Sequence, residues 1–188
     1  RLARRYLCSG GIPGILMLGW APRLVLVSWL RRVGEGRLPK LDMTLWRTGA
    51  GEINPVFQNS TGPFAELVLG DQAALTQFGV RIERLPPGSQ SSERHWHQTE
   101  DELVYVLSGE LVLVEDEEQL LRAGEAAAWP AGKPVAHCLV NRSEADATFL
   151  VIGTRSPTDI VTYPEHGLRL IRNGSERRHE PISPTEPS

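Results

Sequence analysis

The chain has 188 residues, a formal net charge of −3, 40% hydrophobic residues and two cysteines. This length suits one domain with additional segments at its ends, and the ordinary composition excludes a fibrous or disulfide-rich protein. Two cysteines outside any Cys-x-x-Cys pair favour a reducing compartment, so we expect a cytoplasmic protein.

The charge is unevenly distributed along the chain. Residues 1–40 contain eight Arg or Lys and one acid, whereas residues 41–188 contain twelve basic and twenty-two acidic residues. A basic arm can contact nucleic acid or anionic lipid, but a solvated extension is the simpler interpretation. The acidic remainder argues against a nucleic-acid-binding main domain.

Residues 1–47 are predicted to form a poorly defined N-terminal extension. Residues 24–30 fit either a short strand or part of a helix, because periodicity does not separate the two in a short apolar run. Residues 12–18 are apolar after three arginines, as in a signal peptide, but Pro13 and Gly14 interrupt them. No run approaches the roughly 18 apolar residues of a spanning helix, and we predict no membrane span.

Short strands are predicted in regular succession after a loop rich in Gly, Asn and Ser. An early strand is expected at 64–69, followed by a turn or one short helix at 71–76. Eight further strands of four to eight residues are predicted at 78–85, 93–97, 102–107, 110–115, 119–122, 125–129, 135–141 and 147–154. This spacing is typical of an all-β sandwich or barrel.

The predicted β domain covers residues 48–172, with its central part at 78–154. Residues 173–188 contain three prolines among Ser, Thr and Glu. We expect this segment to be a disordered tail.

The histidines of the predicted strands form the main candidate site. Residues two apart in a strand point to the same face, so the rings of His95 and His97 stand side by side. Glu102 follows His97 by an odd offset and reaches that face only if residues 98–101 bend. This segment is polar and turn-like, which favours the bend. His137 comes from a later strand, and alternation places Cys138 on the opposite face.

Residues 88–109, GSQSSERHWHQTEDELVYVLSG, resemble the first sequence motif of the cupin family. In this motif a glycine precedes a His-x-His pair, and a glutamate is followed, after six residues, by another glycine. The spacing to Gly109 selects Glu102 over Glu100 and Asp101.

Residues 124–141, GEAAAWPAGKPVAHCLVN, resemble the second cupin motif, which ends in a histidine and an asparagine. The matching residues here are His137 and Asn141. The spacer before His95 is one residue longer than usual and the spacer before His137 is two longer. Extra residues in turns are well tolerated.

The resemblance implies a double-stranded β-helix, or jelly-roll barrel, with an irregular N-terminal arm. It also implies one divalent transition metal held by His95, His97, Glu102 and His137. Such a ligand set suits Fe, Mn, Zn or Ni and does not select among them. The family further implies a homodimer and a small-molecule ligand.

The sequence leaves three functions open. The first is a cupin that binds a metal and a small molecule without turnover. The second is a metal-dependent enzyme, with an Fe(II) dioxygenase or other oxidoreductase placed ahead of a sugar-type isomerase or epimerase. The third is a ligand-sensing regulatory domain, although no helix-turn-helix pattern accompanies it. No catalytic residue is assigned, because the predicted inward positions Val104, Val106 and Leu139 are apolar.

Several aromatic side chains carry weaker expectations. Trp96 and Trp129 either flank the barrel mouth or pack in the core. Tyr105 should face away from the site. His166 and His179 lie near the end of the chain and are expected to be solvated.

Overall fold

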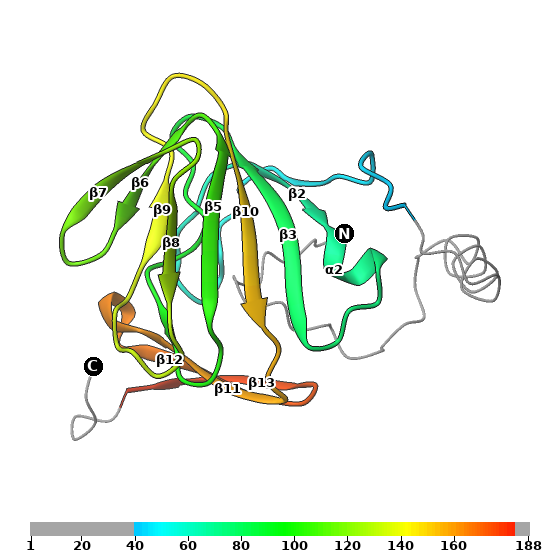
Figure 1. Cartoon of the computed structure of the whole chain (residues 1–188). Coiled ribbons are helices and arrows are strands. Elements are labelled where there is room, and N and C mark those ends of the chain that lie inside the picture. Colours follow the sequence, from blue (N-terminus) through cyan, green and yellow to red (C-terminus); the bar gives the residue numbers. More distant parts are fainter. Residues whose placement is uncertain (1–39, 183–188) are drawn as a thin grey trace, which may run out of the picture.

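A computed structural model describes residues 40–182 of the chain and consists of antiparallel β-sheets (Figure 1). The expected segment at 24–30, most of the N-terminal extension and residues 183–188 lie outside the described residues. Within the described part, no helix has the length and apolar character needed to cross a membrane.

The described elements are almost all strands. In chain order they are β1 (Arg47–Gly49), β2 (Phe64–Val68), α2 (Leu69–Gln72), β3 (Phe78–Leu85), β4 (Trp96–His97), β5 (Glu102–Ser108), β6 (Glu110–Val114), β7 (Glu118–Arg122), β8 (Ala126–Trp129), β9 (Cys138–Val140), β10 (Ala147–Thr154), β11 (Thr158–Tyr163), the 3₁₀ turn η1 (Pro164–His166), β12 (Leu168–Asn173) and β13 (Glu176–Pro181).

The strands form three sheets. The largest has the order β1-β2-β3-β10-β5-β8, the second β13-β12-β11-β4 and the third β7-β6-β9. An isolated bridge between His95, beside β4, and His137, beside β9, joins the second sheet to the third, and a second bridge pairs Gln90 with Val140 of β9. Figure 1 shows the β11, β12 and β13 strands running across the end of the barrel at which β5 begins and β10 ends.

Alternation along the central strands builds the core. In β5 the side chains of Glu102, Val104 and Val106 are buried, whereas Leu103 and Tyr105 on the other face are exposed. This confirms that Tyr105 faces away from the barrel interior. The buried rows of β5 and β10 belong to one hydrophobic cluster with residues of β6, β8 and β9. Full burial of each such side chain contributes about 1.5–3 kcal/mol.

The all-β prediction is confirmed, and the strands predicted between 64 and 154 are present, several with shorter bounds. The expected disorder from residue 173 is wrong for residues 173–181. There β12 and β13 form a hairpin in which Asn173 pairs with Glu176 across a two-residue loop. Gly174 of this loop has a φ of 56°, which its lack of a Cβ permits. The Gly-Ser pair of this loop was a hairpin signal, but the polar sequence of β13 concealed the strand.

Gly109, between β5 and β6, packs closely against the start of β10. Its φ is 75°, and a Cβ there would lie 2.8 Å from the Asp146 carbonyl oxygen and 2.9 Å from the Ala147 Cα. Gly124 also has a positive φ, 92°, but a Cβ would meet nothing within 4 Å. Both alanine variants carry a backbone cost of about 1–2 kcal/mol. Gly109→Ala should lose about a further 1–3 kcal/mol to overpacking. Urea unfolding of the two variants measures the difference, and equal losses would contradict it.

Candidate metal centre

His95 and His97 lie at the junction of two sheets. Backbone hydrogen bonds run in both directions between His95 and His137, at 3.2 and 3.0 Å, so these two residues face each other directly. The His95 and His97 ring centroids are 5.0 Å apart. All three rings are at least 95% buried. The alternation predicted for His95 and His97 is therefore present.

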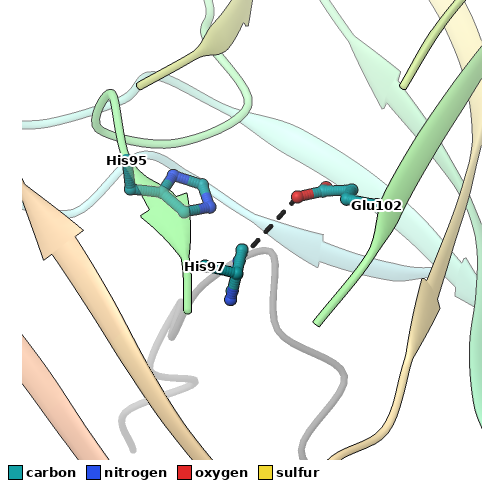
Figure 2. A group of neighbouring side chains, drawn as sticks. All are labelled: His95, His97 and Glu102. Carbon is teal, nitrogen blue, oxygen red and sulfur yellow. Dashed lines mark ion pairs between the residues drawn. The ribbon is translucent and has the colours of Figure 1, made fainter. Parts of the chain in front are cut away.

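Glu102 reaches the same site because the chain bends after β4. Residues 98 and 99 form a bend, and Glu102 then opens β5 with its carboxylate turned inward (Figure 2). Its Oε2 lies 3.8 Å from His97 Nε2. Ligand atoms of His95, His97 and Glu102 all lie within 4.8 Å of one another. The bend expected at 98–101 is thus confirmed.

His137 lies beside this group of three, directly opposite His95. Its Nε2 lies 3.4 Å from Glu102 Oε2. Its ring stacks on Trp129, with centroids 3.6 Å apart and an interplanar angle of 5°. Trp129 is buried and donates its indole N–H to Glu115 Oε1 at 2.6 Å. Of the two roles considered for Trp129, core packing is the one observed, and it holds the His137 ring in place.

Hydrogen bonds on the far side of each ring orient the imidazoles. Nδ1 contacts the Glu93 carbonyl at 2.8 Å in His95, Asp159 Oδ2 at 2.6 Å in His97, and the Val135 carbonyl at 3.1 Å in His137. An acceptor facing Nδ1 fixes the proton there and leaves the Nε2 lone pair for a metal.

Two ring nitrogens of the site lack a partner. The Nε2 atoms of His95 and His97 are buried and have no hydrogen-bond partner among the described residues. A buried polar atom without a partner costs about 1–3 kcal/mol. Three imidazoles and one carboxylate form a donor set suited to a divalent transition metal, which would satisfy these atoms. His95, His97 and Glu102 therefore fit such an ion, and His137, whose Nε2 faces the Glu102 carboxylate, is placed to add a fourth donor.

The electrostatics of the site favour the metal-binding forms of two of its members. Burial, followed by the neighbouring His97 and His137, lowers the pKa of His95 to about 3. Burial alone would raise the pKa of Glu102, but the His137 hydrogen bond and the surrounding histidines lower it to about 2. Near neutral pH, His95 therefore presents a free lone pair and Glu102 a negative charge.

A second layer of charged residues lies behind His97, and the sequence analysis missed it. Asp159 of β11 and Glu100 are both buried, and each has a carboxylate oxygen within 3.9 Å of His97 Nδ1. Burial of His97 would lower its pKa, but the Asp159 hydrogen bond and the nearby carboxylates raise it. Arg172 of β12, also buried, pairs with Glu100 and lies 3.9 Å from Asp159. The available signal for Asp159 was a lone acid in a run of residues that favour strands, Thr, Ile, Val and Tyr.

Other expectations about individual side chains need correction. His166 and His179 are half-buried, not solvated. His166 Nε2 lies 2.9 Å from a Glu93 carboxylate oxygen, and burial lowers the pKa of His179. Cys138 lies outside the group of four, as predicted, and burial raises the pKa of its thiol to about 12.

Arg172 should be a major contributor to stability. Arg172→Met would leave the Glu100 and Asp159 carboxylates buried without their guanidinium partner, which typically costs about 3–5 kcal/mol. Arg142→Met is the control, because it breaks an exposed pair with Glu118. Such pairs contribute little in water. Thermal or urea unfolding should show a large loss for Arg172→Met alone, and similar midpoints for both variants would contradict the assignment.

The fold and site together define a jelly-roll barrel with a buried cluster of three histidines and one glutamate. The family model "Cupin domain" matches residues 81–153. A sugar phosphate isomerase of the cupin superfamily from Silicibacter pomeroyi is 38% identical, with a TM-score of 0.69, covering 80% of this chain and 97% of that chain. The chain belongs to the cupin superfamily.

A second solved structure supports the same grouping. It is that of a candidate sugar phosphate isomerase from Acidithiobacillus ferrooxidans, 28% identical with a TM-score of 0.67. The match covers 78% of this chain and 90% of that chain. No curated protein matches the chain.

Proposed function

We propose that this cupin holds one divalent transition-metal ion through His95, His97, Glu102 and His137 and isomerises a phosphorylated sugar. The observation that carries the metal is the pair of buried Nε2 atoms of His95 and His97, which have no hydrogen-bond partner among the described residues and lie beside the Glu102 carboxylate. The relative at 38% identity supports the substrate class. It is also the reason to rank isomerisation above binding without turnover and above dioxygen chemistry, both of which the sequence analysis placed ahead of it.

Buried charge supports a divalent ion. Three carboxylates lie at the site, those of Glu100, Glu102 and Asp159, and the Arg172 guanidinium balances one of them. Two negative charges remain if the histidines are neutral. Uncompensated charge in a buried site is costly, so a dication offsets this surplus without leaving a net charge.

Isomerisation needs little from the protein beyond positioning and proton control. An aldose and its ketose differ by one hydrogen moved between neighbouring carbons and one proton moved between their oxygens, so no second substrate is consumed. When bound, the metal would act as a Lewis acid on the sugar oxygens. The chain contributes rigid histidines, held at Nδ1, and the Trp129 face that fixes His137. Such prepositioned groups lower the cost of organising the reaction.

Metal binding is tested by removing ligands from opposite sides of the site. The double variant His97→Ala, His137→Ala should lose stoichiometric metal but keep a β-rich circular dichroism spectrum, because the core cluster is intact. His179→Ala is the control, since His179 lies in β13 and belongs to neither group of potential metal-binding side chains. Elemental analysis of tag-free protein after metal loading gives the result. One equivalent of metal retained in the double variant would refute the ligand assignment.

Isomerase activity is tested on metal-loaded protein with a panel of pentose and hexose phosphates. We expect interconversion of aldose and ketose phosphates, followed by ³¹P NMR, and no turnover in the double variant. Chelation of the metal should abolish activity. Adding back the metal that binds stoichiometrically should restore it. Oxygen uptake with aromatic substrates would instead support a dioxygenase. Full metal occupancy with no isomerisation across the panel would support a binding protein without turnover.

A further inference from the structure

The carboxylate of Asp159 contacts two different parts of the metal centre. One oxygen, Oδ2, accepts from His97 Nδ1 at 2.6 Å. The other, Oδ1, accepts from the Thr99 backbone N–H and hydroxyl, both at 2.9 Å. Asp159 is 2% exposed, so water does not compete for these bonds. One buried side chain therefore connects a candidate ligand to the bend that follows it.

This bend decides where Glu102 points. Glu102 lies at an odd offset from His97, and a straight strand would turn it to the opposite face. Each bend residue is bonded to residues 154–160, which run from the last residue of β10 into β11. Gln98 N donates to the Ile160 carbonyl at 3.0 Å, Thr99 bonds to Asp159, Glu100 accepts from Ser156 N at 2.8 Å, and Asp101 bonds to Thr154. Among these partners of the bend, Asp159 is the one whose side chain also forms a hydrogen bond with His97.

We propose that Asp159 is a positioning residue for two of the four metal ligands, His97 directly and Glu102 through the bend at Thr99. The inference rests on the proposed metal function of the site. Asp159 holds the proton of His97 on Nδ1 and so keeps the Nε2 lone pair directed at Glu102, whose Oε2 is 3.8 Å away. Partners of this kind commonly change metal affinity by about 10- to 100-fold.

The contacts of Asp159 with His97 and Thr99 require both carboxylate oxygens to act as acceptors. The variant Asp159→Asn therefore tests them directly. Asparagine has nearly the same shape but only one oxygen. If that oxygen faces Thr99, the amide N–H₂ meets His97 Nδ1 and forces the proton onto Nε2. If it faces His97, the N–H₂ opposes the Thr99 N–H and the bend loosens. Either arrangement disturbs a ligand.

Thr99→Val is the matched control. It removes the hydroxyl but keeps the backbone N–H and the whole Asp159 carboxylate. The Thr99 side chain is exposed, so valine also fits without repacking the core. Both bonds that the inference depends on therefore survive in this variant.

The experiment measures Co²⁺ and Zn²⁺ affinity, the visible spectrum of the Co²⁺ form, and the tautomer of His97 in metal-free protein by ¹⁵N NMR at a pH where the ring is neutral. We expect Asp159→Asn to weaken binding about 10- to 100-fold and change the Co²⁺ spectrum, with Thr99→Val within about threefold of wild type. The wild-type ring should carry its proton on Nδ1. An Nε2 proton in wild type, or unchanged affinity and spectrum in Asp159→Asn, would overturn the inference.

These readouts separate the inference from the proposed function. If wild-type protein binds neither metal, the metal function fails, and the tautomer of His97 in the wild type and in Asp159→Asn still tests the positioning. If wild type binds metal but isomerises nothing, only the substrate assignment fails. In that second case, a loss of the Co²⁺ spectrum in Asp159→Asn with folding retained still supports the positioning.

Discussion

The antiparallel bridge between His95 and His137 is the contact on which the rest of the site depends. Its two backbone hydrogen bonds join the sheet that contains β4 to the sheet that contains β9. Residues directly opposite in such a pair present neighbouring side chains on one face. The same bonds that close the barrel therefore bring together two imidazoles that are far apart in sequence. Closing the fold and assembling the candidate metal centre are here a single event.

The site combines neutral donors with surplus negative charge. His95 is kept neutral by its burial, and Glu102 is kept ionised by the histidines around it. Behind them, Arg172 compensates only part of the charge of Glu100 and Asp159. Such an arrangement is costly without a cation and is stabilised by one, so metal binding and folding should be coupled in this protein.

Local sequence patterns predicted most of the barrel, because strand alternation and turn residues act over short distances. The set of four candidate ligands came from the resemblance to the two cupin motifs. The bend that turns Glu102 inward followed from its odd offset to His97. The layer formed by Asp159 and Arg172 could not be predicted from local patterns. Its members come from β11 and β12 and approach His97 only in the folded sheet. β13 was missed because a polar edge strand lacks the apolar alternation on which strand prediction relies.

The candidate ligands and the residues that orient them lie in different segments of the chain. All four candidate ligands fall within residues 81–153, the stretch that matches the cupin model, whereas Asp159 and Arg172 lie beyond it. A barrel cut at the boundaries of that match would contain every candidate donor atom. It would lack Asp159 and Arg172, the groups behind His97. The segment needed to reproduce this site is consequently longer than the matched domain. Substitutions in β11 and β12 could change the metal affinity during evolution without replacing a ligand.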